Sequence, residues 1–419
     1  MDLRKWLTPG LEVKRWLLLL GLGIVCLALG IAYLQVTLSR NLDVPPVFYY
    51  LTLQFIPRLG RALLFGLLGV GLAASGIIGL NRSLLSAQAR YATSTPLLDA
   101  LYRRRAQHGP KVVAIGGGTG LSTLLRGLKL YTANLTAIVT VADDGGSSGR
   151  LRRLLGVPPP GDFRQCIAAL AEAEPLMTQL FEYRFQSGDA LEGHSFGNLF
   201  IVAMQGITGS FEAALRESSR VLNVIGRILP ATLEDVTLSA ELVNAEVVHG
   251  ESAVPHGGAA IHRVFLQPAA PAAYPAALQA IMDADLVIVG PGSLYTSVLP
   301  NLLVPSLAQA LKDTRALRIY VCNVASQPGE TDGYILSDYL AALKNHIGSL
   351  PLDLVLVNNH LVELPPAWGV TQVGPEPAAA AFGVPIVPAD LLNLSRPTRH
   401  DPAKLAARLM ALHTSHRER

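Results

Sequence analysis

Two glycine-rich runs stand directly after short apolar runs that are typical of buried strands. The run Gly116–Gly120 (GGGTG) follows Lys111–Ile115, and Gly290–Thr296 (GPGSLYT) follows Asp285–Val289. The first run leads into leucines at helical spacing, which predicts a strand, a turn and the start of a helix. Backbone N–H groups at such a helix start bind anions, and glycine lets a phosphate approach the backbone closely. Taken alone, the first run fits phosphate binding and a purely structural turn equally well.

A pair of aspartates, Asp143 and Asp144, follows the next apolar run, Leu135–Val141. In a doubly wound sheet this second strand lies beside the first, so both aspartates should lie near the first glycine run. Their carboxylates could accept hydrogen bonds from a ribose, or hold a divalent cation such as Mg²⁺ near a phosphate. The alternative is a solvated turn that carries two charges, but the position at a strand end favours a functional role.

Further polar residues stand at predicted helix starts. Asp162 is expected to cap a helix at its N-terminus. Arg164 is a candidate phosphate contact, because a guanidinium group is a bidentate donor. His194 and Asn198 lie in a turn before an apolar helix, where a histidine can do acid–base chemistry but more often makes structural hydrogen bonds. The candidate ligand-binding residues are, together, Gly116, Gly117, Gly118, Thr119, Gly120, Leu121, Asp143, Asp144, Arg164, His194, Asn198, Gly290, Gly292, Ser293, Tyr295, Thr296, Asn323 and Gln327.

Apolar runs and helical repeats alternate around these residues and predict the sheet that positions them. Three strand patterns between residues 285 and 357 alternate with helical stretches, an order typical of a mostly parallel sheet. Residues 236–267 instead contain short β-like runs and turns, which predicts a small antiparallel insertion. The predicted fold is a Rossmann-like, doubly wound α/β domain over residues 111–400, with a C-terminal helix and tail over 401–419. Its glycine-rich loops fall at the carboxyl edge of the sheet, where ligands bind in such folds.

Two uncharged apolar runs precede this domain. Residues 16–38 and 62–80 are each long enough, at ~1.5 Å rise per residue, to cross a ~30 Å hydrocarbon core. Basic residues precede the first run and follow the second, which predicts that both termini face the cytoplasm. The sequence thus predicts a two-helix transmembrane anchor over residues 1–82 and a juxtamembrane linker over 83–110, in a multi-pass protein of the bacterial inner membrane. A cleaved signal peptide and a buried core helix are the alternatives for the first and second runs.

The overall composition restricts the classes of partner. Charged residues make up 16% of the 419 residues, the mean hydropathy is +0.36 and the formal net charge is +3. No long basic run with interleaved aromatic residues occurs, so nucleic acid is not an expected partner. The three cysteines are far apart and lack CxxC spacing, which argues against a disulfide framework or a zinc site. A GxxxxGK[ST] motif is absent, so the chain is not a P-loop NTPase.

Six ordered motifs between Lys111 and His360 resemble those of the gluconeogenesis factor family (YvcK-like), which is related to the 2-phospho-L-lactate transferases (CofD-like). They are GGGTGLS (116–122), VADDGGSSGRLR (141–152), PPGDFRQC (159–166), GHSFGN (193–198), GPGSLYTSVLPNLLV (290–304) and NVASQPGET (323–331). The resemblance implies a Rossmann-like cytoplasmic domain that binds UDP-sugars such as UDP-N-acetylglucosamine. It also implies a role in carbon-source adaptation, cell shape and peptidoglycan synthesis, without a firm enzymatic activity.

Three functions are consistent with these residues. The first is a regulator that binds a nucleotide sugar without turning it over, with the first glycine run on the diphosphate and Asn198, Tyr295 and Asn323 lining the pocket. The second is a Mg²⁺-dependent transferase that forms a phosphodiester, with the ion at Asp143 or Asp144. The third is a membrane scaffold whose glycines are structural. We expect the first, with Mg²⁺ as the one candidate cofactor, and leave open a homo-oligomer and a contact with cell-wall synthesis proteins.

Overall fold

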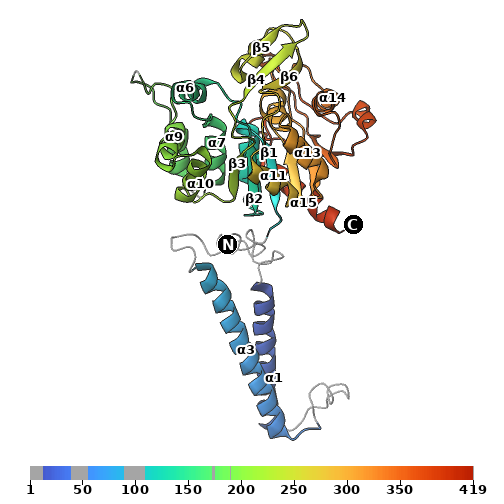
Figure 1. The fold of residues 1–419 in the computed structure, drawn as a ribbon. Coiled ribbons are helices and arrows are strands. Elements are labelled where there is room, and N and C mark those ends of the chain that lie inside the picture. The colour runs from blue at the N-terminus through green and yellow to red at the C-terminus, as the bar shows by residue number, and fades with distance from the viewer. Residues whose placement is uncertain (1–12, 39–54, 89–108, 172–174, 189, 419) are drawn as a thin grey trace. The chain divides into compact units, whose positions relative to one another are not determined.

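The chain divides into two compact units, residues 1–105 and 106–419. The computed structural model describes residues 13–38, 55–88, 109–171, 175–188 and 190–418 (Figure 1). The first unit is a helical hairpin of α1 (Val13–Leu38) and α3 (Arg58–Gln88). Helix α3 therefore continues past residue 82 into the predicted linker, and the remainder of that linker lies outside the described residues up to residue 108.

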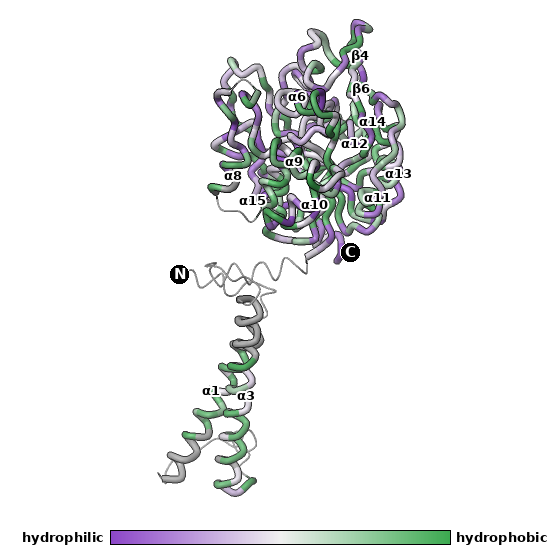
Figure 2. Tube along the Cα trace, turned by 60° about the vertical axis from the view of Figure 1, so that its left-hand side comes forward, coloured by the Kyte–Doolittle hydropathy of each residue, from purple (hydrophilic) through white to green (hydrophobic). Residues whose placement is uncertain are grey.

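Glycine brings the two helices of the hairpin into close contact. A Cβ added to Gly23 of α1 would lie 2.8 Å from the backbone nitrogen of Ala73 in α3, so the two backbones touch at this point. Large apolar side chains point away from this contact: Leu18 is 70% and Leu67 is 72% exposed. Figure 2 shows that the described part of both helices is predominantly apolar.

The two runs that the sequence predicts to cross a membrane are helical in the structure, but their ability to cross a membrane is not confirmed. Residues 16–38 fall within α1 and residues 62–80 within α3. Over the part of the chain that the structure describes, no helix combines the length and the apolar character that crossing a membrane requires.

The second unit is built on a seven-stranded sheet with the strand order β10-β9-β8-β7-β1-β2-β3, in which all neighbours are parallel. From β1 the chain moves outward to β2 and β3, then returns to place β7 on the other side of β1 and continues outward to β10. The switch point of the topology therefore lies between β1 and β7, as expected for a doubly wound fold. The strands are β1 (Val112–Gly116), β2 (Leu135–Val139), β3 (Arg227–Pro230), β7 (Leu286–Val289), β8 (Leu317–Val321), β9 (Leu354–Asn358) and β10 (Ile386–Ala389).

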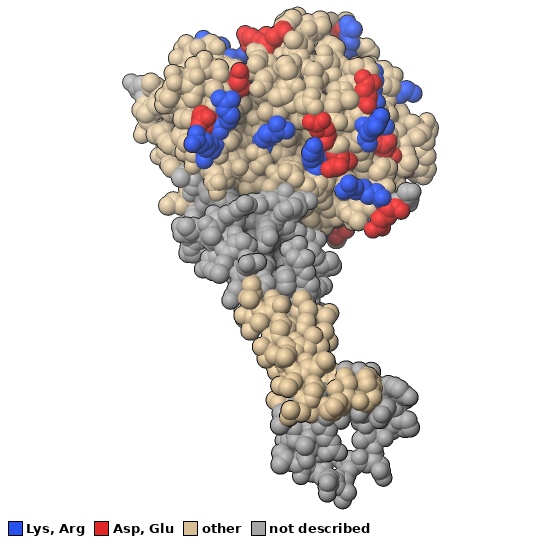
Figure 3. All heavy atoms as spheres, turned by 60° about the horizontal axis from the view of Figure 1, so that its bottom comes forward, with Lys and Arg blue, Asp and Glu red and all other residues tan. Residues whose placement is uncertain are grey.

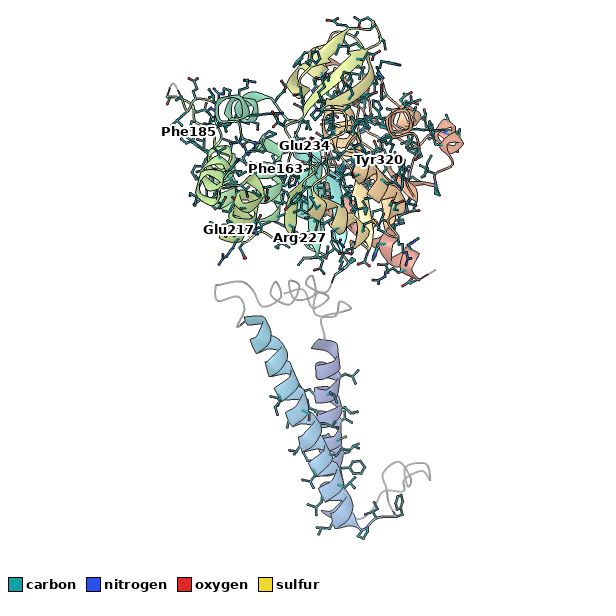
Figure 4. All side chains as sticks on the ribbon, in the orientation of Figure 1. Phe163, Phe185, Glu217, Arg227, Glu234 and Tyr320 are labelled. Carbon is teal, nitrogen blue, oxygen red and sulfur yellow. The ribbon has the colours of Figure 1, made fainter. Side chains whose placement is uncertain are left out.

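Helices flank the sheet and complete its core (Figure 1). Every side chain of the apolar strands β1, β2 and β7 is buried, which requires cover on both faces of these strands. Phe163 and Tyr320 are two of the large buried side chains and belong to α7 and β8 (Figure 4). On the face in Figure 3, acidic and basic side chains of this unit are interspersed. The helices are α5 (Gly118–Leu128), α6 (Gly146–Leu155), α7 (Gly161–Leu170), α8 (Pro175–Glu182), α9 (Phe196–Thr208), α10 (Phe211–Val221), α11 (Pro275–Met282), α12 (Leu299–Leu302), α13 (Pro305–Asp313), α14 (Leu336–Ile347) and α15 (Pro402–Arg417).

The predicted antiparallel insertion is confirmed as a three-stranded sheet with the order β5-β4-β6. It consists of β4 (Thr237–Leu242), β5 (Val247–His249) and β6 (Ile261–Gln267), with the 3₁₀ turn η2 (Glu251–His256) between β5 and β6. His346 of α14 attaches it to the main body, because its Nε2 accepts a hydrogen bond of 2.9 Å from the N–H of Val264. The insertion lies at one end of the parallel strands (Figure 1).

Candidate functional site

The two glycine-rich loops lie against each other at the switch point. They follow β1 and β7, which are neighbours in the sheet. A Cβ added to Gly120 would lie 2.5 Å from the carbonyl oxygen of Pro291 and 2.7 Å from Cα of Gly292. Glycine is therefore required at position 120, because any side chain would collide with the backbone of the second loop. The structure thus brings together two runs that the sequence predicts to share a site.

Asn301 joins the two loops from inside the protein. Its side chain is fully buried, and its Nδ2 donates hydrogen bonds to the carbonyl oxygens of Gly116, at 3.0 Å, and Ser297, at 2.8 Å. The first carbonyl ends β1, and the second lies in the π-helical turn η3 (Leu294–Val298) that follows the second loop. Asn301 is not among the predicted site residues, although it lies within the motif GPGSLYTSVLPNLLV.

The carboxylate of Asp162 accepts a hydrogen bond from α5, contrary to the predicted role of Asp162 as the N-cap of its own helix. Helix α7 begins at Gly161, so Asp162 lies inside its first turn, and its carboxylate accepts a hydrogen bond from the N–H of Gly118 in α5. A Cβ at Gly117 would collide with this carboxylate. Burial, followed by the negative charge of Asp143, raises the pKa of Asp162 to about 7. Packing between helices has overridden the local capping preference.

Asp143 lies beside this carboxyl group, and both Asp143 and Asp144 accept hydrogen bonds from backbone N–H groups. Asp143 Oδ1 accepts from the N–H of Gly145 at 2.9 Å, and Asp144 Oδ1 accepts from the N–H of Ser252 at 2.8 Å. Burial raises the pKa of Asp143, whereas its hydrogen bonds with the N–H of Gly145 and the side chain of Ser148 lower it. Among the described residues, no three histidine, cysteine, aspartate or glutamate side chains form a group that could hold a metal ion, so the predicted metal site at this pair is not confirmed.

Two glutamates that are not among the predicted site residues complete the acidic side of this edge. Glu251 begins η2, and Glu330 follows β8. Burial, followed by the negative charges of Asp143, Asp162 and Glu330, raises the pKa of Glu251 to about 8. Burial also raises the pKa of Glu330. Glu330 lies within the motif NVASQPGET, whereas no sequence signal marks Glu251, which reaches the site through the insertion.

His194, Asn198 and Ser147 form a buried hydrogen-bonded group at the starts of α6 and α9. Ser147 Oγ lies 2.9 Å from His194 Nδ1 and accepts from Asn198 Nδ2 at 3.0 Å. Burial, followed by the charge of Arg150, lowers the pKa of His194, which favours the neutral ring at neutral pH. His194 is thus part of a structural hydrogen-bond group.

Arg164 lies near this group but is largely buried. Its side chain crosses the start of α9, where a Cβ at Gly197 would lie 2.7 Å from Arg164 Cγ. Burial, followed by the charge of Arg184, lowers its pKa. Within the described residues its Nε has no hydrogen-bond partner.

The polar residues after β7 and β8 form one hydrogen-bonded chain. Asn323 Oδ1 accepts from the N–H of Gly292 at 3.3 Å, and its Nδ2 donates to Gln327 Oε1 at 3.2 Å. Gln327 Nε2 in turn donates to Ser293 Oγ at 2.8 Å. These predicted residues therefore meet beside the second glycine loop.

Three other predicted residues differ in their access to this edge. Tyr295 is buried, and its hydroxyl lies 2.8 Å from that of Tyr334. Burial, followed by this hydrogen bond, raises the pKa of Tyr295. Leu121 is fully buried in the core, so a ligand could meet only its backbone. Thr119 is exposed in the first turn of α5, and its carbonyl accepts from the hydroxyl of Thr123 at 2.8 Å.

Comparison with known proteins places this site in a family. The family model described as 2-phospho-L-lactate transferase CofD matches residues 112–369. The chain belongs to the CofD family. The range shared with the CofD family begins at β1 and includes both glycine loops and all the carboxylates described above.

Relatives within the CofD family agree with this assignment and confirm the expected similarity to gluconeogenesis factors. The gluconeogenesis factor of Bacillus subtilis is 46% identical and covers 72% of this chain and 98% of its own. A relative from Nostoc sp. is 47% identical over 97% of this chain and 91% of its own, so its match includes the hairpin. A crystal structure of a Bacillus halodurans protein, 45% identical, superposes with a TM-score of 0.69 and covers 72% of this chain and 99% of that chain.

Proposed function

We propose that the second unit binds a nucleotide sugar, with UDP-N-acetylglucosamine as the reference ligand, at the carboxyl edge of the sheet between β1 and β7. The observation that supports this most strongly is the contact of Gly120 with the backbone of Pro291, because it joins two glycine loops at the switch point. Nucleotides bind at such crevices in doubly wound folds, and helix starts such as that of α5 favour phosphate groups. Asn323 and Gln327 supply amide groups beside the second loop for the polar edge of a base or sugar.

The raised pKa values at this edge make it compatible with an anionic ligand. With pKa values of about 7 for Asp162 and about 8 for Glu251, these carboxyl groups are largely protonated in mildly acidic solution. A protonated carboxyl group does not repel a diphosphate. The ligand therefore meets neutral carboxyl groups where the sequence alone suggests negative charge.

The protein acts as a sensor that links carbon metabolism to cell shape and cell-wall synthesis. Support for the metabolic link comes from relatives named gluconeogenesis factors. Calorimetry of the full chain with UDP-N-acetylglucosamine tests the binding step. We expect saturable heat and a raised Tm, with the ligand recovered unchanged. An absence of heat and of thermal shift at millimolar ligand contradicts the proposal.

A Mg²⁺-dependent transferase is the second candidate, favoured by the family description and by the carboxylates beside the glycine loops. Phosphoryl chemistry depends mainly on positioning and charge stabilisation, so it does not require a nucleophilic side chain. In this case the chain would turn over a nucleotide substrate with Mg²⁺, and Asp144→Asn would abolish the turnover. Turnover in the wild type together with its loss in Asp144→Asn would show that the protein is an enzyme and not a sensor.

The hairpin attaches the protein to the inner membrane, with the α/β unit on the cytoplasmic side. This part of the proposal is supported by the exposed apolar side chains of α1 and α3, such as Leu18 and Leu67, since exposed apolar patches mark interaction surfaces. Flotation of the full chain with phospholipid vesicles tests it, with Leu18→Glu/Leu67→Glu as the variant and Leu154→Glu, an exposed leucine of the second unit, as the control. Equal flotation of variant and wild type would exclude attachment through this surface.

A further inference from the structure

One carboxylate oxygen of Glu330 is buried in the site and accepts no hydrogen bond from the described residues. Its Oε1 accepts from Thr296 Oγ1 at 3.0 Å, and the backbone N–H groups of Tyr295 and Thr296 also donate to the carboxylate. The residue is only 8% exposed, yet its Oε2 has no hydrogen-bond partner among the described residues. A buried carboxylate oxygen without a donor costs free energy, so this position is suited to a donor that arrives with a ligand.

The insertion places Glu251 near Glu330. Its turn η2 is attached on one side by the Ser252 N–H, which donates to Asp144. On the other side, Gly329, the neighbour of Glu330, packs so tightly on the carbonyl of Pro255 that a side chain at this glycine would collide with it. The turn therefore bridges the loops that follow β2 and β8, and Glu251 faces the carboxylates of both loops.

The chemistry of this group favours a neutral ligand rich in hydrogen-bond donors. Within the described part of the chain, no group of acidic side chains is arranged to hold a metal ion. Glu330 has an acceptor to offer, while Glu251, when protonated, can donate one hydrogen bond and accept another. Sugar hydroxyl groups are both donors and acceptors, so they satisfy both kinds of carboxyl group.

We propose that Glu330 and Glu251 form the sugar subsite of the nucleotide-sugar site, with Glu330 Oε2 accepting a hydrogen bond from a sugar hydroxyl and Glu251 closing over the ring from the insertion. The inference rests on the proposed function. It assigns recognition of the nucleotide to the glycine loops and recognition of the sugar to the two glutamates. It therefore makes the insertion a specificity element.

Calorimetry of the full chain with UDP and with UDP-N-acetylglucosamine, at constant pH, distinguishes the recognition of the nucleotide from the recognition of the sugar. We expect Glu330→Gln to weaken UDP-N-acetylglucosamine binding by about tenfold or more, as loss of a hydrogen bond to a charged group predicts. Glu251→Ala should weaken it as well, because it removes both the donor and the acceptor of the protonated carboxyl group, which a glutamine would keep. At pH 6.5, where Glu251 of the wild type is protonated, both variants should leave UDP affinity within about twofold, because UDP lacks the sugar. Glu246→Gln, at an exposed turn of the same insertion, is the matched control and should change neither affinity.

The outcomes distinguish this inference from the proposed function. A wild-type chain that binds neither ligand removes the proposed function and the sugar subsite with it. A wild-type chain that binds both ligands, with glutamate variants that lose UDP and UDP-N-acetylglucosamine equally or lose neither, overturns the sugar subsite alone. Thermal unfolding of each variant checks that it is folded, and a variant with a lowered Tm is replaced by Thr296→Val, which removes the hydroxyl that holds Glu330 and should show the same selective loss.

Discussion

Gly120 and Pro291 are in contact across the switch point, with the position of a Gly120 Cβ only 2.5 Å from the carbonyl oxygen of Pro291. Gly120 lies in the first turn of α5, after β1, and Pro291 lies in the loop after β7. Their contact fixes the distance between the two glycine loops. The loops therefore act as one surface, and a change in one of them displaces the other.

Replacement of Gly120 by alanine should separate the loops. We expect Gly120→Ala to lower the stability by about 1–3 kcal/mol, as overpacking does in a dense interior. UDP-N-acetylglucosamine affinity should fall at least tenfold, because both loops shift. Chemical denaturation and calorimetry measure the two effects. Gly206→Ala, in α9 with no heavy atom within 4 Å of its Cβ position, is the control and should be neutral or slightly stabilising. Unchanged affinity in Gly120→Ala would show that the loop contact is irrelevant to binding.

Asp162 should make the protein less stable as the pH rises. Its pKa is raised from 3.8 to about 7, so between these values the folded chain keeps a proton that the unfolded chain has lost. Stability therefore falls across this window and stays lower above it. Asp162→Asn removes the titrating group but keeps an acceptor for Gly118. At pH 8.5 we expect its Tm to exceed that of the wild type by roughly 2–8 °C, with a smaller difference at pH 5. Parallel Tm profiles for both proteins would refute this assignment.

Ligand affinity should also decrease in alkaline solution. Asp162 and Glu251 lose their protons near pH 7 and pH 8, and the resulting charges oppose a diphosphate. In the absence of Mg²⁺, we expect affinity to fall above pH 8 by about tenfold per pH unit for each linked proton. Calorimetry at pH 7.5 in buffers of different ionisation enthalpy should show proton uptake on binding. Proton release, or an affinity that rises with pH, would indicate that a cation joins the ligand at these carboxylates.

His400 should limit stability in acid. It is buried, its ring donates to the backbone of Cys322, and burial lowers its pKa from 6.5 to about 4. Between pH 4 and pH 6.5 the unfolded chain binds a proton at His400 that the folded chain does not bind. The contribution of His400 to the free energy of unfolding is therefore fully present above pH 6.5 and is lost as the pH falls toward 4. The shift corresponds to about 3 kcal/mol. His400→Gln should flatten this part of the denaturation profile, whereas His416→Gln, at an exposed position of α15, should leave it unchanged. Identical acid profiles for the wild type and His400→Gln would contradict the prediction.

The central strands of the sheet could be predicted from sequence, but its edges could not. Strands β1, β2 and β7 are buried on both faces and are therefore continuous apolar runs. The edge strands β3 and β10 are four residues long, partly exposed, and contain Pro230 and Pro388. Proline and mixed polarity are tolerated at an edge because one side of the strand needs no hydrogen-bond donors. Because these two strands are short, partly exposed and contain proline, they do not form apolar runs that could be recognised in the sequence.

The structure brings together the two glycine loops that the sequence predicts to share a site, and tertiary packing adds residues beside them that the sequence does not indicate. The meeting of Gly120 with the second loop follows from the order of the strands. Asn301 and Glu251 reach the site from a helix interior and from the insertion, which no local pattern reveals. The sequence predicts that Asp162 caps its own helix, but its carboxylate accepts a hydrogen bond from the N–H of Gly118 in another helix. Each of these residues depends on contacts between segments distant in sequence.

The return of the chain from β3 to β7 has a consequence for the protein during its synthesis. Everything up to the insertion, including β1, β2 and the first glycine loop, leaves the ribosome before β7 exists. The second glycine loop is then missing, and the edge of β1 that later pairs with β7 is uncovered. Under the proposed function, a nascent chain therefore cannot bind the nucleotide sugar until β7 and the loop after it have emerged.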